Sequence, residues 1–136
     1  MRFIAVSALL VLAGCAATPQ ETARAQAEEQ ARAQKIDAKL AGRVPGPPVD
    51  CLPTLPGNRP STTIGSTILY EDGPGLIYRN DTTGGCEAAE RGDIIVTVSN
   101  GGRLCRGDIA QTFNPVARSV PTGSCALGSF VPYRKP

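Results

Sequence analysis

The sequence predicts a small, mainly β domain that is held by two disulfide bonds and preceded by one N-terminal helix. From residue 61 onward, short runs rich in Val, Ile, Thr and Tyr alternate with Gly and Pro turns. Only 4% of the 136 residues are aromatic, so a domain of this size needs cross-links to supplement its core. Four cysteines are placed to supply them: Cys51, Cys86, Cys105 and Cys125. We expect five or six short strands forming a small antiparallel sheet or a barrel-like domain.

Residues 18–42 are predicted to form one helix. Thr18-Pro19-Gln20-Glu21 is a capping box with proline at the first helical position, and Gly42 suits a left-handed C-terminal cap. The sequence between them is mostly strong helix formers, and Glu28 with Arg32 forms a favourable i,i+4 pair. No heptad seam is present, which argues against a coiled coil, although a partner-binding helix stays open.

Only Ile36 and Leu40 of this helix could dock on a neighbour. We therefore expect the helix to be a spacer roughly 36 Å long. Replacing both residues by alanine should then cost under about 1 kcal/mol, as on a protein surface.

Residues 43–60 are rich in proline and are predicted to form a hinge with a first short strand near Val49–Leu52. The all-β domain then occupies residues 61–136. Its first hairpin joins residues 64–71 to residues 76–80 through Asp72-Gly73-Pro74-Gly75. A three-residue loop that pairs Glu71 with Gly75 buries the most apolar surface, because it places four large side chains on one face: Ile68, Tyr70, Leu76 and Tyr78.

A second hairpin is predicted from residues 93–99 and 103–109, with Asn100-Gly101 as its type I′ turn. In this hairpin the alternating Ile94, Val96 and Val98 should point inward. Residues 125–133 form the closing strand, with Pro132 at an edge or strand end.

Apart from Cys15, the chain has four cysteines, and an even number indicates disulfides in a chain that enters an oxidising compartment. A metal site is disfavoured because the sequence has no His and no C-x₂-C spacing. If the strands form an antiparallel meander, Cys86 and Cys105 lie at opposite ends of the sheet, too far apart to bond. The predicted pairs are therefore Cys51–Cys105 and Cys86–Cys125. The nested pattern, Cys51–Cys125 with Cys86–Cys105, stays open as the alternative.

The first fifteen residues read as an export signal. Met1-Arg2 is followed by a ten-residue apolar run, too short to span a bilayer, and then by Leu12-Ala13-Gly14-Cys15. This ending resembles the lipobox of bacterial lipoproteins. The resemblance implies that residues 1–14 are a signal peptide, that Cys15 is acylated, and that the protein is held on the membrane by lipid, facing the periplasm or the cell surface. Ala16 lacks the Asp that favours the inner membrane, so the outer membrane is expected. The alternative is an ordinary cleavage site.

Residues 49–135 also resemble a group of small proteobacterial envelope proteins of unknown function with four similarly placed cysteines. The resemblance supports the disulfides and the β fold, and it implies no activity. It rests on four segments: Asp50-Cys51-Leu52, residues 67–70, Leu104-Cys105-Arg106-Gly107-Asp108 and residues 123–133.

No catalytic, cofactor or metal residue is predicted. Without His there is no Ser-His-Asp triad or imidazole base. Paired carboxylates remain as candidates, and among them Asp108 stands out, although capping backbone donors or pairing with Arg106 explains it as well. The other candidates are Asp50, Glu71, Asp72, Asp81, Glu87, Glu90 and Asp93. Tyr70, Tyr78 and Tyr133 are expected to pack in the core rather than line a groove.

The formal net charge is only +2, and the basic residues are not clustered in the sequence. We therefore expect no nucleic-acid partner, because such a partner needs a clustered basic face. The function expected is a non-catalytic envelope lipoprotein, a membrane-tethered binding or structural module for a periplasmic or surface protein. The alternative is an inhibitor of an envelope-directed hydrolase such as a lysozyme or protease. An enzyme that uses carboxylates is the third possibility.

Overall fold

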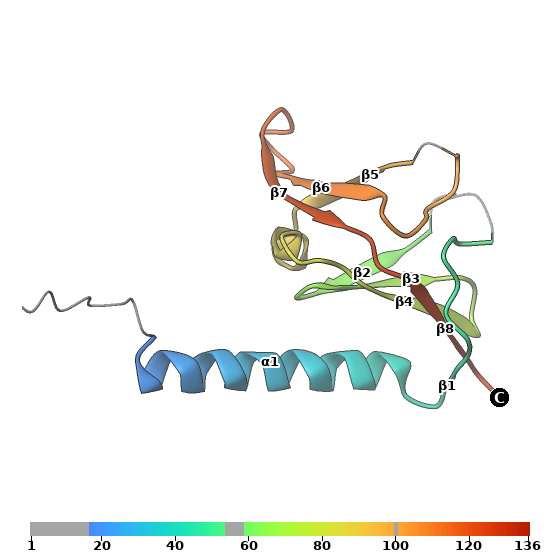
Figure 1. The fold of residues 1–136 in the computed structure, drawn as a ribbon, viewed down its shortest axis with the longest axis horizontal. Helices are drawn as coiled ribbons and strands as arrows, with labels where there is room; N and C mark the ends of the chain where they lie inside the picture. The colour runs from blue at the N-terminus through green and yellow to red at the C-terminus, as the bar shows by residue number, and fades with distance from the viewer. Residues whose placement is uncertain (1–16, 54–58, 100) are drawn as a thin grey trace, which may run out of the picture.

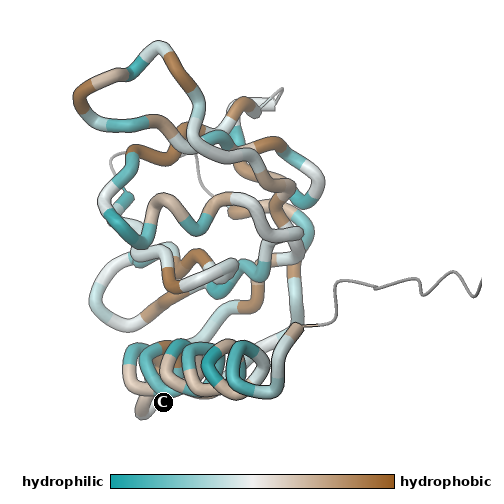
Figure 2. Tube along the Cα trace, turned by 90° about the vertical axis from the view of Figure 1, so that its left-hand side faces the viewer, coloured by the Kyte–Doolittle hydropathy of each residue, from teal (hydrophilic) through white to brown (hydrophobic). Residues whose placement is uncertain are grey.

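The computed structural model describes residues 17–53, 59–99 and 101–136, so the predicted signal and lipidation site at Cys15 lie outside it. In these ranges one helix and eight strands form three layers (Figure 1): the helix α1, a five-stranded antiparallel sheet and a three-stranded antiparallel sheet. Figure 2 shows the same layers nearly along the axis of α1, whose turns are largely polar. The mainly β fold with an N-terminal helix is confirmed, with two sheets in place of one.

The five-stranded sheet has the order β1-β8-β4-β3-β2, and the three-stranded sheet has the order β5-β6-β7. The elements are α1 (Pro19–Leu40), β1 (Val44–Pro45), β2 (Ser61–Ile64), β3 (Thr67–Glu71), β4 (Leu76–Asp81), the 3₁₀ helix η1 (Glu87–Arg91), β5 (Ile94–Val98), β6 (Ile109–Phe113), β7 (Pro121–Ala126) and β8 (Phe130–Arg134).

Both predicted caps of α1 are confirmed. The backbone N–H of Glu21 donates to Thr18 Oγ1 over 3.2 Å, and the N–H of Thr18 donates to Glu21 Oε2 over 2.8 Å. The hydrogen bonds from Thr18, first from its backbone and then from its hydroxyl, lower the pKa of Glu21 below its ordinary value of 4.5. The helix ends at Leu40, and Gly42 follows with a φ of +71°. A left-handed glycine at this position is the usual way to end a helix.

The C-terminal half of α1 docks on the five-stranded sheet. Ile36 and Leu40 are buried in a cluster with three residues of the sheet, Ile64, Leu69 and Ile77. The expectation that these two side chains behave like surface residues is therefore wrong. The range 19–31 is exposed and projects past the sheets (Figure 1). At 1.5 Å per residue, the part of the helix free to act as a spacer is about 20 Å long.

The described part of the predicted hinge is attached to the sheet. Val44 and Pro45 pair with β8, and Val49 forms an isolated bridge to Phe130. The first short strand expected near Val49–Leu52 is thereby reduced to single bridges, the second being Cys51 with Cys105. Proline explains this, because it cannot donate to a continuous ladder.

The first hairpin has the predicted faces but closes one residue later along the chain. The N–H of Asp72 donates to the carbonyl of Leu76 over 2.8 Å, so the three-residue loop starts at Gly73. The chain slips by one residue on both strands, which preserves the inward and outward alternation. Ile68, Tyr70 and Tyr78 are consequently buried on one face, as predicted, and Leu76 packs against them.

The second predicted hairpin is wrong. Strand β5 pairs with β6, which begins only at Ile109, and the chain before β6 lies against the Cys51 segment. There the carbonyl of Leu104 accepts a hydrogen bond from Leu52 N–H over 2.9 Å. The disulfide and this pairing involve residues far apart in sequence, so they override the local turn preference of Asn100-Gly101.

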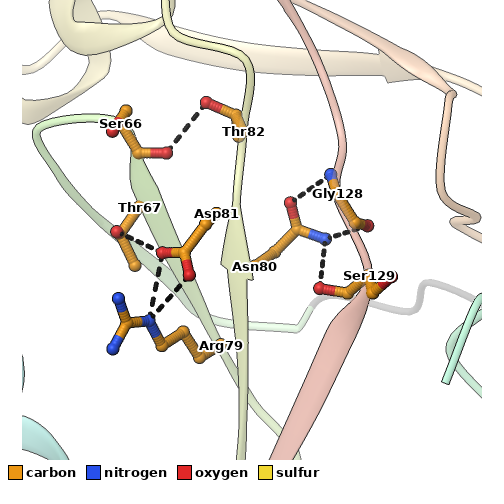
Figure 3. Close-up of polar contacts among 8 residues, drawn as sticks. All are labelled: Ser66, Thr67, Arg79, Asn80, Asp81, Thr82, Gly128 and Ser129. Carbon is orange, nitrogen blue, oxygen red and sulfur yellow. Dashed lines mark hydrogen bonds and ion pairs between the residues drawn. The ribbon is translucent and has the colours of Figure 1, made fainter. Parts of the chain in front are cut away.

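The predicted closing strand is divided into β7 and β8, which belong to different sheets. Buried Asn80 fixes the crossing between them (Figure 3): its Nδ2 donates to the carbonyl of Gly128 over 2.7 Å, and its Oδ1 accepts from Gly128 N–H over 3.0 Å. A Cβ at Gly128 would overlap the carbonyl oxygen of Asp81, so only glycine fits there.

The core lies between the two sheets and is crossed by one disulfide. Its members are Leu52, Ile68, Tyr70, Tyr78, Cys86, Leu104, Ala110, Cys125, Leu127 and Phe130. The disulfides are Cys51–Cys105 and Cys86–Cys125, the predicted pairs, with Cα atoms 4.0 and 5.5 Å apart. They join residues separated by 54 and 39 positions, and each contributes about 4 kcal/mol in the chain-entropy model.

Candidate protein-binding surface

The three-stranded sheet presents its outer face to solvent, on the side away from α1 (Figure 1). Residues directly opposite one another in antiparallel strands share a face, and the registers of β5, β6 and β7 give this face three rows of three residues. We call these nine residues the outer face: Ile94, Phe113 and Pro121; Val96, Gln111 and Ser124; Val98, Ile109 and Ala126. None of the nine is charged.

Branched aliphatic side chains on the outer face are largely exposed. Val96 is 46% exposed, Val98 is 61% exposed, and Ile109, directly opposite Val98, is 46% exposed. A single exposed aliphatic residue is ordinary on a protein surface, whereas a contiguous apolar patch marks an interaction site. The exposed aliphatic residues of the outer face are neighbours in one ladder, so they form an apolar cluster, with Gln111 and Ser124 as its polar members.

The predicted inward orientation of Ile94, Val96 and Val98 is wrong. Ile95 and Thr97 turn to the core instead, opposite the fully buried Thr112 and Ala110. The buried side of this sheet already holds Ala110, Thr112 and the Cys86–Cys125 disulfide. It therefore has room for the two inward side chains of β5, Ile95 and Thr97, rather than for the three of the alternative set. The sequence Ile-Ile-Val-Thr-Val is β-branched throughout, and its alternation is too weak to identify the buried side.

Two connections carry exposed arginines beside the outer face. Arg118 belongs to the 114–120 connection, which lies at the top of Figure 1, and Arg103 belongs to the connection between β5 and β6. The 114–120 connection also exposes Val116 (93%) and Val120 (60%). The connections that adjoin the outer face thus carry exposed cationic and apolar side chains, while Asp93 and Asp108 directly precede β5 and β6.

A cleft of about 540 Å³ lies between α1 and the five-stranded sheet. On its wall the guanidinium Nε of Arg79 contacts Asp81 Oδ1 over 3.0 Å, and the same carboxylate oxygen accepts from the Thr67 hydroxyl over 2.7 Å (Figure 3). Burial lowers the pKa of Arg79, but hydrogen bonding and charge from Asp81, with a further contribution from Tyr133, outweigh it and raise the pKa. These three polar side chains of the wall thus form one hydrogen-bonded group centred on the Asp81 carboxylate.

Glu90 connects three elements beside this cleft. Its carboxylate lies 3.4 Å from Arg32 Nε and 3.7 Å from Lys35 Nζ, both on α1, and accepts a hydrogen bond from Gly65 N–H over 3.0 Å. The helix is thereby joined to η1 and to the turn between β2 and β3. Arg32 and Gly65 of the cleft lining thus take part in contacts that hold the helix in place.

Asp108, the most prominent carboxylate in the sequence, caps a backbone donor. Its Oδ2 accepts from Cys105 N–H over 2.8 Å. Arg106, the other partner considered for it, lies 3.3 Å from Asp50 instead. Asp108 therefore shapes the turn that carries the Cys51–Cys105 disulfide.

Most of the other candidate carboxylates also have structural partners. Asp72 lies 3.4 Å from Arg59, and Glu87 accepts from Gly85 N–H over 2.9 Å. Asp93 accepts from the Thr122 hydroxyl. Glu71 is half-buried at the end of β3. These contacts give Asp72, Glu87 and Asp93 capping and pairing roles in the fold.

Tyr70 and Tyr78 are buried in the core as predicted, and Tyr133 is half-buried against the helix-facing cluster. Burial raises the pKa of the Tyr70 phenol. In the ranges 17–53, 59–99 and 101–136, no group of three His, Cys, Asp or Glu residues is placed to hold a metal ion. Within the same ranges, no helix combines the length and apolar content needed to span a membrane.

Comparisons of the chain with protein-family models, with curated proteins and with solved structures found no match. The outer face is therefore the main feature from which a function can be argued, although Ile94, Val96 and Val98 on it are predicted from the sequence to point inward. A signal for it is present in the sequence, because β5 has no charged residue on either face.

Proposed function

We propose that this protein is a non-catalytic envelope lipoprotein, a membrane-tethered module that binds a periplasmic or surface protein through the outer face. One observation carries the proposal: nine neighbouring positions on an exposed sheet face contain no charge and include exposed Val96, Val98 and Ile109. Leaving such a patch in water is unfavourable, at about 25 cal/mol per Å² of apolar surface. A bound protein surface would remove that cost.

The proposed anchor is Cys15 of the lipobox-like Leu12-Ala13-Gly14-Cys15, with the outer membrane as its location. Three acyl chains would hold the protein on the membrane essentially permanently, whereas one chain binds reversibly. The exposed part of α1, the range 19–31, begins shortly beyond the anchored residue. It would separate the domain from the lipid by up to about 20 Å and leave room for a partner.

The scaffold under the outer face favours tight binding. The Cys86–Cys125 disulfide lies directly beneath β6 and β7, so the face is preorganised and loses little conformational entropy on binding.

Photo-crosslinking in living cells tests the proposal. A photoreactive amino acid at Val96 should give a discrete crosslinked envelope protein, whereas the same group at Gln34, exposed on α1, should not. Adding Gln111→Lys on the same face should abolish the crosslink from position 96 to this other protein, because it buries an unpaired charge in the interface. Identical products from positions 96 and 34, or none from either, would contradict the proposal.

One feature favours an inhibitor of an envelope-directed hydrolase as the second candidate. The 114–120 connection projects at the edge of the domain and is internally ordered, because Asn114 Oδ1 accepts from the N–H groups of Val116 and Ala117 over 2.9 and 3.1 Å. Its exposed tip suits insertion into an enzyme cleft. In that case the crosslinked partner is a hydrolase, and Val116→Asp relieves its inhibition while Val96→Asp does not.

A further inference from the structure

The edge strands of the two described sheets are protected unequally. Edges attract strands from other chains, and natural proteins protect them with proline, glycine, charge, bulges or short length. The edge β1 has two residues, one of them Pro45, and β7 contains Pro121 and Gly123 beside a bulge. The remaining edges of the described sheets are β2 and β5.

Strand β2 is also protected. It is bounded by Pro60 and Gly65, and the N–H of Gly65 is bonded to Glu90 of η1. Strand β5 has none of these devices within its own length: Ile94–Val98 contains no proline, glycine or charged residue. Gly92 and Asp93 precede it, and within the described sheets it pairs with β6 alone. Every second residue of β5 therefore directs its backbone N–H and C=O toward an open edge.

We propose that β5 pairs with β5 of a second copy of this chain, antiparallel and centred on Val96. In this register Val96 lies opposite Val96 of the second copy, and Ile94 lies opposite Val98. On the inner side Ile95 lies opposite Thr97. Every cross-strand pair then joins β-branched side chains and no pair brings like charges together, which is the favourable case for sheet pairing.

The sequence of β5 matches itself when it is paired antiparallel about Val96. This match is the reason for proposing a second copy of the chain, rather than another protein, as the strand that pairs with β5. Antiparallel pairing of one strand with itself gives a closed two-fold dimer, the commonest form of soluble oligomer. The pairing uses the edge and leaves the outer face free. It would join two outer faces into one six-stranded, uncharged surface, so it is independent of whether that surface binds a further protein.

Cysteine trapping in membranes that carry the full-length chain tests the register. Val96→Cys should give a disulfide-linked dimer on mild oxidation, because Cα atoms directly opposite in an antiparallel pair are about 4.5–5.5 Å apart, within reach of a disulfide. Val120→Cys is the control: it is 60% exposed but precedes β7, two strands away from β5 in the sheet, and it should stay monomeric. Equal dimer yields from both variants, or no dimer from Val96→Cys, would overturn the proposal.

A pair of lysine variants separates edge pairing from face-to-face packing. Val96→Lys places two charges together at the two-fold axis and should weaken dimerisation about tenfold or more in sedimentation measurements. Gln111→Lys adds the same charge to the same outer face one strand away from the edge and should leave the dimer within about twofold of the parent. Equal weakening by both variants would mean that the copies meet through the face. Because Gln111→Lys interrupts partner crosslinking but not dimerisation, the proposed function and the dimer can fail separately.

Discussion

Docking of α1 on the sheet gives the sharpest stability prediction. Ile36 and Leu40 are 7% and 6% exposed and contact Ile64, Leu69 and Ile77. Truncating a buried Ile or Leu to alanine costs about 2–5 kcal/mol. We use the lower end, because a helix on the outside of a sheet can move inward to reduce the cavity, and alanine returns a few tenths of a kcal/mol of helix propensity. Ile36→Ala with Leu40→Ala should therefore destabilise the fold by about 4 kcal/mol.

Urea unfolding of residues 17–136 with both disulfides intact measures this effect. With a slope of about 2 kcal/mol per molar urea, the midpoint should fall by about 2 M. Gln30→Ala with Gln34→Ala is the matched control, since it has the same spacing on the exposed side of the helix, and it should stay within about 0.5 kcal/mol of the parent. A loss below about 1 kcal/mol for the Ile36 and Leu40 pair would refute the docking argument.

Single side chains give the remaining predictions. Asn80→Ala should lower the free energy of unfolding by about 2 kcal/mol, seen as a lower calorimetric melting temperature, because the N–H and C=O of Gly128 lose their partner. Glu21 has a folded pKa below 4.5, so its contribution to the helix N-terminus is present above that pH and is lost as the pH falls through the folded value. The amide resonance of Thr18 should report this loss on acidification, and Glu21→Gln should remove the pH dependence. Cys15→Ser should abolish incorporation of labelled palmitate, and a protein that stays labelled would exclude Cys15 as the lipidation site.

The sequence is most informative where structure is decided locally. The capping box at Thr18 and the left-handed Gly42 involve neighbours within four residues, and both are predictable. The three-residue loop after Asp72 is predictable for the same reason, although its closing pair moves by one residue. Turn and cap chemistry of this kind depends little on the rest of the molecule.

Long-range contacts account for the errors. The i,i+4 spacing pairs Arg32 with Glu28, but Arg32 lies beside Glu90, on the distant element η1. The buried side of β5 depends on Ala110, Thr112 and the disulfide below them, which no local pattern reveals. The disulfide pairs are nevertheless predicted correctly from a meander whose second hairpin is wrong. Which cysteines can pair depends on the end of a sheet at which each one lies, and much less on the exact residue at which a strand starts or stops.

The position of β8 determines when this domain can fold during synthesis. Strand β8 lies inside the five-stranded sheet, with β1 on one side and β4 on the other, so it joins parts of the chain separated by as much as the distance from Val44 to Arg134. Because a chain leaves the ribosome N-terminus first, β1 and the β8-facing edge of β4 must wait unpaired until Phe130–Arg134 has been made. Such high contact order makes folding slow. The export proposed for this protein requires an extended chain during passage through the membrane, and delayed folding would keep the chain in that form.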